Sequence, residues 1–343
     1  MDRRPAVVLL NLGGPDSLGA VRPFLYNLFA DPDIFKFPLG AVLQKPLAAL
    51  IAWRRAPEAA KGYAAIGGKS PLLENTLVQA QALQHALADE EDKLARVAGT
   101  RRALPAGSDN APLADVHVCM RYWHPMAPEV VGRLKAAGYT RVVLLPLYPQ
   151  YSVTTTGSSY NDFRRACERA SYRPELRLIR EWYDDADYHQ AIVDSIENEM
   201  SRFPVPDPER IELLFSAHGL PKKVVDAGDP YRDHIEATYA AVRSRLGWPH
   251  VALCYQSRVG PLEWLRPYTD DVIREKAAAG TKQMLVYPIA FVSDHVETLF
   301  ELGITYAELA RKRGIAHYRV APALNAHPLL IRALARRVRE ALA

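Results

Sequence analysis

The chain contains 343 residues, 49% of them hydrophobic and 24% charged, with a formal net charge of +4. This is the composition of a globular protein with enough apolar material for two hydrophobic cores, so we expect two domains. The charge is small and its basic clusters are dispersed, which argues against a nucleic-acid partner but permits contact with anionic ligands or lipid headgroups.

Short apolar runs alternate along the chain with segments of helical periodicity. Strands are predicted at residues 6–12, 116–122, 142–148, 211–217, 251–255 and 284–291, and helices at 72–87 and 128–137. Residues 98–112, rich in Gly, Pro, Ser and Asn, are predicted to form a surface loop. Because the strands are apolar on both faces, the pattern favours parallel sheets covered by helices, a doubly wound α/β fold.

The first turns contain glycines but no nucleotide-binding motif. Gly13-Gly14 follows the first predicted strand without completing a G-x-G-x-x-G fingerprint. Residues 67–70 resemble the end of a phosphate-binding loop, but Tyr63 stands where that loop requires glycine. We therefore expect turns at both places and no nucleotide partner.

Residues 34–53 form an apolar segment that two lysines and two prolines interrupt and that Arg54-Arg55 follows. The segment is too interrupted to span a bilayer, and no other apolar run is long enough to do so. One interpretation is a helical hairpin buried in the domain. The other, which we favour, is an apolar lip that borders a pocket for a flat apolar ligand and lies on a membrane surface.

The second half of the chain repeats the pattern of the first. Residues 116–149 comprise a strand, a helix that ends in a Lys-Ala-rich turn with glycine, and a strand that ends in Tyr-Pro; residues 251–288 repeat this order. Residues 9–15 correspond in position to the segment around His218. This predicts a duplicated α/β unit with a cleft between two domains, which the strand ends face.

We divide the chain accordingly. The N-terminal domain is predicted at residues 1–175, with the lip at 31–56, and the C-terminal domain at 176–324. The last helix, residues 325–343, is expected to pack back on the N-terminal domain.

Cysteine usage and the N-terminus bear on the compartment. Cys119, Cys167 and Cys254 lie far apart without a Cys-x-x-Cys pair, so neither a disulfide framework nor a thiolate metal site is indicated, and a reducing cytoplasm fits. Residues 1–10 faintly resemble a secretion signal, but Asn11 and the glycines after it cut the apolar stretch short. We interpret this segment as the first strand and its turn.

His218 follows directly after an apolar run, where a strand is expected to end in an abrupt turn. A second apolar run ends just before Ser293, so two strand ends offer a histidine together with Asp294, Glu297 and Glu301. Side chains at the ends of parallel strands face a cleft and not the core. Imidazoles and carboxylates are groups for metal binding and proton transfer. For His218 itself, a hydrogen-bonded structural histidine is the alternative.

The three carboxylates are spaced for one face of a helix. Asp294, Glu297 and Glu301 are separated by three and four positions. Like charges so close together are unfavourable unless cations or protons pass along them, which indicates a route for a metal ion. Alternatively, Asp294-x-x-Glu297 is a capping box and Glu301 a solvated residue one turn later. The spacing leaves both interpretations open.

Seven motifs occur in order along nearly the whole chain. They are LNLGGP (10–15), IGGKSP (66–71), RYWHP (121–125), YPQYS with TTGSS (148–159), FSAHGLP (215–221), QSRVGP (256–261) and PIAFVSDHVETL (288–299). In this combination the chain resembles the ferrochelatases, enzymes that insert ferrous iron into a porphyrin in haem synthesis. The resemblance implies two Rossmann-like domains with the porphyrin held between them.

The resemblance also implies roles for single residues. His218 and Glu297 correspond to the catalytic, iron-contacting pair, with Asp294 and Glu301 as further carboxylates of the metal path and His295 in support. The porphyrin-binding residues that it implies are Arg121 and Tyr122 on the opposite side of the macrocycle, Trp264 and Phe291 as aromatic wall, and Arg55, Tyr63 and Ser70 near the propionates. Porphyrin and ferrous iron are substrates here, and no prosthetic group is expected.

These residue types suit the chemistry. Metallation requires the removal of two pyrrole protons and a bent macrocycle, so such an enzyme supplies a base, a metal donor and a shaped pocket. A neutral His218 imidazole accepts a proton or ligates iron, but one nitrogen cannot do both at once. Few ligands and no thiolates suit delivery, because a closed four-ligand site would retain the metal.

Members of the family differ from one another in two properties that matter for this chain. Some members hold a [2Fe–2S] centre through a C-terminal cysteine cluster, whereas the last cysteine here is Cys254, so no cluster is expected. One branch acts on coproporphyrin III, but the apolar segment 34–53 resembles that of the branch that acts on protoporphyrin IX at the membrane surface. We therefore predict a cytoplasmic enzyme, peripheral on the inner face of the membrane, that makes protohaem.

Three alternatives to this prediction are open. They are a coproporphyrin III ferrochelatase, a cobalt or nickel chelatase of the same fold, and a noncatalytic porphyrin or metal carrier. The presence of Arg121-Tyr122 together with the acidic segment 294–301 argues against the carrier, which needs no acidic metal route.

Overall fold

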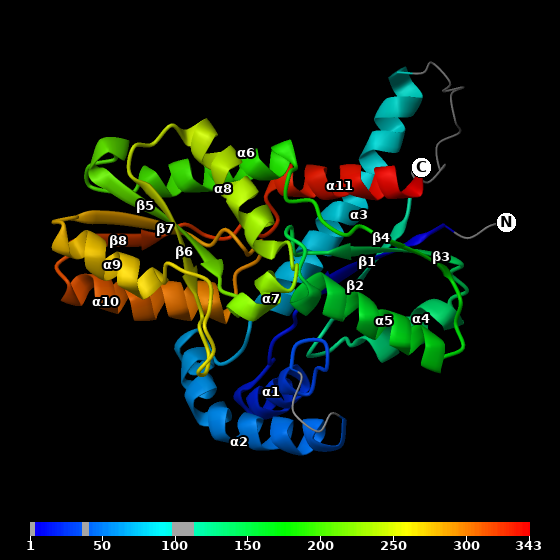
Figure 1. The fold of residues 1–343 in the computed structure, drawn as a ribbon. Helices are drawn as coiled ribbons and strands as arrows, with labels where there is room; N and C mark the ends of the chain where they lie inside the picture. The colour runs from blue at the N-terminus through cyan, green and yellow to red at the C-terminus, as the bar shows by residue number, and fades with distance from the viewer. Residues whose placement is uncertain (1–3, 36–40, 98–112) are drawn as a thin grey trace.

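The computed structural model describes residues 4–35, 41–97 and 113–343. The predicted surface loop at 98–112 and residues 36–40 of the predicted lip lie outside the described residues. Within the described part, the chain forms two four-stranded parallel sheets that lie side by side, with helices around them (Figure 1).

The two sheets have the same topology. The first, of order β2-β1-β3-β4, consists of β1 (Ala6–Asn11), β2 (Asp115–Met120), β3 (Arg141–Pro146) and β4 (Glu175–Leu178). The second, of order β6-β5-β7-β8, consists of β5 (Ile211–His218), β6 (Val251–Gln256), β7 (Gln283–Tyr287) and β8 (His317–Val320). The predicted pair of Rossmann-like parallel sheets and their duplication are confirmed.

The edge strands β4 and β8 have no counterpart among the predicted strands. Each is four residues long, and their residues are half-buried or exposed, so neither contains the apolar run by which the central strands are recognised. The strand predicted to reach residue 291 ends at Tyr287, because Pro288 has no amide hydrogen to donate to the sheet. The chain therefore leaves β7 several residues before His295.

Helices cover the sheets on both faces (Figure 1). In chain order the α-helices are α1 (Val21–Phe29), α2 (Ala41–Ala65), α3 (Leu72–Val97), α4 (Ala127–Ala136), α5 (Ser158–Arg169), α6 (Ala186–Met200), α7 (Lys222–Asp226), α8 (Tyr231–Leu246), α9 (Thr269–Ala278), α10 (Ala307–Lys312) and α11 (Pro328–Leu342). Shorter segments are the 3-10 helices η1 (Leu18–Ala20) and η3 (Pro208–Arg210) and the π-helical η2 (Val153–Gly157) and η4 (Glu297–Tyr306).

One hydrophobic core is shared by both sheets. Val7 and Leu9 of β1 and Leu213 and Phe215 of β5 belong to one cluster of buried side chains that also includes residues of α3, α6, α8 and α11. The opposite face of the first sheet packs on α4 and α5, and that of the second on α9, η4 and α10. Because large apolar interfaces oppose relative motion, this core holds the two sheets in a fixed relation.

The predicted lip is a helical hairpin with one exposed apolar patch. α1 and α2 pack around a small core of their own, against which Ile34 and Phe35 are half-buried. In contrast, Leu50 and Trp53 on α2 are 57% and 60% exposed. The packing of α2 on α1 fits the hairpin interpretation, and the border of a ligand pocket and the membrane contact stay predictions. No helix within residues 4–35, 41–97 and 113–343 has the length and apolarity needed to cross a membrane.

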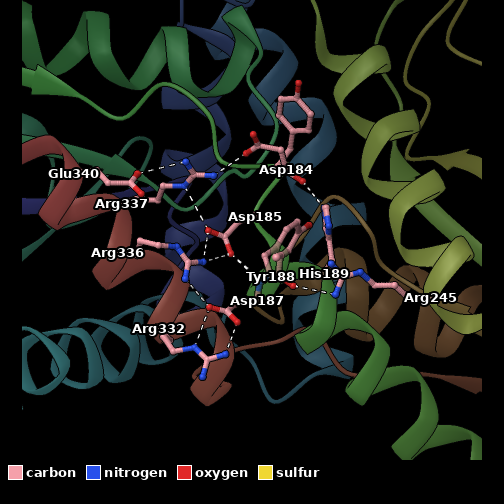
Figure 2. A network of polar contacts seen from close by, with 12 residues as sticks. Asp184, Asp185, Asp187, Tyr188, His189, Arg245, Arg332, Arg336, Arg337 and Glu340 are labelled. Carbon is pink, nitrogen blue, oxygen red and sulfur yellow. Dashed lines mark hydrogen bonds and ion pairs between the residues drawn. The ribbon is translucent and has the colours of Figure 1, made fainter. Parts of the chain in front are cut away.

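An ion-pair cluster ties α11 to the start of α6 (Figure 2). Asp185 is almost fully buried and accepts two hydrogen bonds from amides in the first turn of α6. Arg336 of α11 donates to both oxygens of Asp185, and Arg332 pairs with Asp187 in the same turn. α11 also contacts α3 and β3 of the first half. The domain boundary at residue 175 stays a prediction.

Arg336→Ala is expected to lower the free energy of unfolding by about 2 kcal/mol, because Asp185 would lose both hydrogen bonds from Arg336 and retain as a charged contact the longer ion pair with Arg337, at 3.5 Å. Urea unfolding at pH 7 measures this. The matched control is Arg164→Ala, which removes an exposed pair with Glu168 and should cost under about 0.5 kcal/mol. Equal losses in the two variants would contradict the role of the cluster.

The same cluster makes stability depend on acid pH. Hydrogen bonds from Arg332 and Arg336 lower the pKa of Asp187 to about 2, from 3.8. A carboxyl with a lowered folded pKa adds stability above its unfolded pKa, and this stability is lost as the pH falls through the folded value. We expect the free energy of unfolding to decrease between pH 4 and 2, and to decrease less over that range for Arg336→Ala.

Candidate active site

His218 is the last residue of the central strand β5, and its side chain is one-third exposed. A Cβ on Gly219 would lie 3.0 Å from the Gln256 carbonyl oxygen and 3.2 Å from the Trp264 ring, so glycine permits the tight turn that follows. Nδ1 of His218 lies 2.5 Å from the Gly219 carbonyl oxygen. This assigns the proton to Nδ1 and leaves Nε2 as an acceptor in the neutral ring.

Glu297 faces two imidazoles. Its Oε2 lies 3.8 Å from Nε2 of His218 and 3.9 Å from Nε2 of His295. Nδ1 of His295 donates to the Ser293 carbonyl oxygen, so its Nε2 is also an acceptor. Burial lowers the pKa of His295, although the Glu297 carboxylate opposes this shift, so the ring is neutral at pH 7. Two imidazole nitrogens that accept protons thus face one carboxylate, and both kinds of group are also found as metal ligands.

Glu301 lies beside Glu297 and is held by several donors. The Ser257 hydroxyl contacts the carboxylates of both residues. The Ser257 amide, the Gln256 side chain and the Tyr306 hydroxyl also donate to Glu301. Burial, and after it the like charge of Glu297, raise the pKa of Glu301. Glu301 therefore takes up a proton more readily than an ordinary glutamate, as proton transfer near neutral pH requires.

Helix α2, from the first half of the chain, closes the other side of this group. A Cβ on Gly62 would lie 3.1 Å from the Phe300 ring and 3.4 Å from Val296, so α2 packs closely on η4. The adjacent Tyr63 is buried, and its burial together with the Glu297 charge raises the pKa of its hydroxyl. The predicted porphyrin residue Tyr63 therefore lies within electrostatic reach of Glu297.

Two of the predicted aromatic residues flank His218. The ring centroids of Trp264 and Phe291 lie 6.2 and 6.3 Å from that of His218. Phe291 also lies 4.4 Å from the ring of His295, edge to face. The Trp264 indole is fixed by donation of its N–H to the Val259 carbonyl oxygen. The imidazoles therefore lie beside an aromatic surface on which a flat ligand can pack.

Arg121 and Tyr122 belong to a different polar cluster, around Asp31. The Tyr122 hydroxyl donates to Asp31 at 2.6 Å, and Tyr122 has no exposed surface. Arg121 pairs with Asp31 at 2.9 Å, and its Nε donates to the Ser158 hydroxyl at 2.8 Å. These contacts fix both side chains within the first half of the chain. Their predicted contact with porphyrin stays a prediction.

Asp294 does not share the helix face of Glu297 and Glu301. The helix begins after it, and its oxygens accept hydrogen bonds from the Thr298 hydroxyl and the Asn325 side-chain amide. It lines a separate cavity of about 470 Å³ on η4. The common face predicted for three carboxylates is therefore wrong at Asp294, and the capping box is not formed either, since Glu297 faces the histidines.

The last two predicted residues lie on helices of the first half. Arg55 is exposed on α2. Ser70 is buried before α3, where its hydroxyl accepts from the Leu72 amide, which caps the helix. Neither makes a described contact with His218 or Glu297.

Ser257 and Tyr306 are the residues that the sequence analysis does not single out. Ser257 follows the apolar run of β6 after one residue, so the strand-end rule that selects His218 also applies to it. Tyr306 carries no such signal, because its contact with Glu301 depends on the π-helical turn. Among the residues that the structure describes, no group of three or more His, Cys, Asp or Glu side chains is placed to hold a metal ion.

Comparisons with known proteins agree across the whole chain. A family model described as Ferrochelatase matches residues 4–342. A ferrochelatase of Cyanothece sp. is 46% identical, over 99% of this chain and 83% of its own. A ferrochelatase of Synechococcus sp. is also 46% identical, over 99% and 94%. The solved structure of SirB from Bacillus subtilis with Fe3+ has a TM-score of 0.53 at 11% identity, covering 99% of this chain and 96% of that one, which shows a shared fold.

Glu297→Gln is expected to lower the pKa of Glu301, because it removes the like charge, while burial still keeps the value above the ordinary one. A carbon-13 NMR titration of the side-chain carboxyls measures this. Glu308→Gln, on the exposed face of α10, is the matched control and should leave Glu301 unchanged. An identical Glu301 titration in all three proteins would show that the two carboxylates do not interact.

Proposed function

The chain belongs to the ferrochelatase family, enzymes that insert iron into a porphyrin in haem biosynthesis, and on this premise we propose that it metallates protoporphyrin IX through His218 and Glu297. The observation that carries the proposal is the convergence of two imidazoles on the Glu297 carboxylate beside an aromatic surface. Nitrogen and carboxylate donors suit ferrous iron, and an open, partly exposed set of them suits a metal that is a substrate.

Metallation releases two pyrrole protons, and the site contains acceptors for both. Nε2 of His218 is unprotonated in the neutral ring and one-third exposed, so it is available to a ligand beside Trp264 and Phe291. Glu301, whose pKa is raised, accepts a second proton that reaches it from Glu297 through the Ser257 hydroxyl. His218 acts on a proton and on the metal in turn, because one nitrogen lone pair cannot serve both together.

Exposed apolar side chains on α2 and in the loop after β6 support a porphyrin with apolar substituents. Protoporphyrin IX carries two vinyl groups and two propionates, whereas coproporphyrin III carries four propionates. Leu50 and Trp53 on α2 are exposed, as are Val259 and Leu262 in the loop after β6, which extends toward α2 in Figure 1. Apolar side chains favour the vinyl-bearing substrate, since carboxylates need cationic or polar partners when they leave water.

The same exposed residues support contact with a membrane. Leu50 and Trp53 form an apolar patch on α2, next to the exposed cations Arg54 and Arg55. Apolar side chains flanked by cations bind the interface of a bilayer with anionic lipids. We propose that the chain lies on the inner face of a membrane through this patch, where apolar porphyrins partition.

The proposal includes no iron–sulfur cluster. Cys119, Cys167 and Cys254 are buried, the first two in the core between β1, α4 and α5, and the third in the core of the second sheet. Burial raises the pKa of Cys167 to about 11 and that of Cys254 to about 12. These thiols are therefore protonated at neutral pH and unsuited to hold iron as thiolates.

The chemical assignment is tested under anaerobic conditions with ferrous iron, by following the porphyrin absorption. We expect kcat/KM for protoporphyrin IX to exceed that for coproporphyrin III by about tenfold, and His218→Ala to lose about 100-fold or more of the activity. The exposed His250→Ala should remain fully active. A preference for coproporphyrin III would refute the substrate, and an active His218→Ala would refute the site.

Membrane contact is tested by cosedimentation with vesicles of phosphatidylserine and phosphatidylcholine. Trp53→Ser is expected to weaken binding by about tenfold, because it removes a large apolar side chain from the interface. Leu77→Ser, which replaces a leucine on α3 that is 52% exposed, should bind like the unchanged protein. Equal binding by Trp53→Ser and the unchanged protein would exclude the patch on α2.

A further inference from the structure

The loop that carries His295 belongs to the second half of the chain, but α3 of the first half holds it. The Asn75 side-chain amide donates to the Asp294 carbonyl oxygen at 3.1 Å. The Gln79 side chain is fully buried and has three partners beyond its own helix, of which the Val292 carbonyl oxygen, at 3.5 Å, is the most distant. It accepts a hydrogen bond from the Ser293 hydroxyl at 3.1 Å and donates one to the Asn325 carbonyl oxygen at 2.8 Å.

Asn325, which accepts a hydrogen bond from Gln79, is itself bound to the loop that carries His295. Its side-chain oxygen accepts from the Asp294 amide at 3.0 Å, and its side-chain amide donates to the Asp294 carboxylate at 2.8 Å. Its backbone amide donates to the Val292 carbonyl oxygen at 2.7 Å. Asn325 has a positive φ of 48°, a conformation that asparagine tolerates better than most residues. Gln79 therefore binds two segments that are already bound to each other.

We propose that Gln79 is a positioning residue for the reaction: it fixes the place of His295 and Glu297 relative to the first half of the chain. His295 follows Ser293 after one residue, and its Nδ1 donates to the Ser293 carbonyl oxygen. Glu297 begins η4 two residues later. A displacement of Ser293 from α3 thus moves both the imidazole and the carboxylate. The inference rests on the proposed function of this group.

The chemistry of the Gln79 contacts requires an amide. One partner is a hydroxyl donor and the other two are carbonyl acceptors, so the side chain must both accept and donate. A carboxylate would face the Asn325 carbonyl oxygen without a hydrogen, and an aliphatic side chain would leave both groups unpaired. Because Gln79 and Ser293 are buried, water does not replace the lost contacts.

The matched control lies on the same helix. Gln84 also bridges two backbone groups through its side-chain amide, donating to the Ala114 carbonyl oxygen at 2.8 Å and accepting from the Val116 amide at 2.8 Å. These groups lie at β2, within the first half. Gln79→Leu and Gln84→Leu therefore remove the same kind of side-chain hydrogen bonds. Those of Gln79 reach the second half of the chain, whereas those of Gln84 stay within the first half.

We expect Gln79→Leu to reduce kcat/KM for ferrous iron by about 10- to 100-fold, the range for groups that orient metal donors. The KM for porphyrin should change less than about threefold, since Trp264 is held by the Val259 carbonyl oxygen and not by the loop that contains Ser293. Gln84→Leu should leave both constants unchanged while lowering the thermal midpoint to a similar extent. Ser293→Ala removes the hydrogen bond from the Ser293 hydroxyl to Gln79 with little change in volume, and it should also reduce kcat/KM for ferrous iron.

The outcomes separate a positioning role from a structural one. If both glutamine variants reduce activity in proportion to their loss of stability, or if Gln79→Leu and Ser293→Ala keep the kinetics for iron, the proposal is overturned. His218→Ala is measured alongside. If that variant keeps full activity, the site itself is misassigned, which is a result distinct from any behaviour of Gln79.

Discussion

The hydrophobic core that both sheets share is the constraint on which the rest of the structure depends. Alternate residues of β1 and β5 enter the same cluster, together with side chains of α3, α6, α8 and α11. Because this interface is apolar and continuous, the two sheets cannot turn relative to each other without exposing it. Groups that follow the strands of the second sheet can therefore be held by helices of the first, as α2 and α3 hold η4 and its preceding loop.

The π-helical geometry of η4 then decides how the carboxylates are presented. Its hydrogen bonds join residues five apart, which widens the turn and places Glu297 and Glu301 where one Ser257 hydroxyl contacts both. The same turn brings Tyr306 back to Glu301. Such segments are rare and concentrate at functional sites, because the wider turn is less favourable than an α-helix unless tertiary contacts support it. Here the close packing of Gly62 on Phe300 is one such contact.

Much of this arrangement can be predicted from the sequence, and there are physical reasons why the rest cannot. The central strands and the place of His218 follow from apolar runs that end abruptly, and those runs are strong signals in buried parallel strands. The prediction for Asp294 assumes a helix with 3.6 residues per turn. It is wrong because the helix starts after Asp294 and continues as a π-helix. Gln79 and Ser257 depend on partners many positions away, and no local pattern encodes such contacts.

The nitrogen and oxygen atoms around Glu297 that can bind iron differ in whether they already accept hydrogen bonds from the protein. This difference bears on iron delivery. Glu301 accepts hydrogen bonds from Ser257, Gln256 and Tyr306, so its oxygens are occupied by the protein itself. Within the described part of the chain, no donor contacts Nε2 of His218 or of His295, and Glu297 faces both. On the proposed assignment, iron would meet few strong donors, and Glu301 would take a proton when the Ser257 or Tyr306 hydroxyl rotates from donating to accepting. A porphyrin offers four nitrogens, so a weakly held metal moves toward it as the two that carry protons lose them.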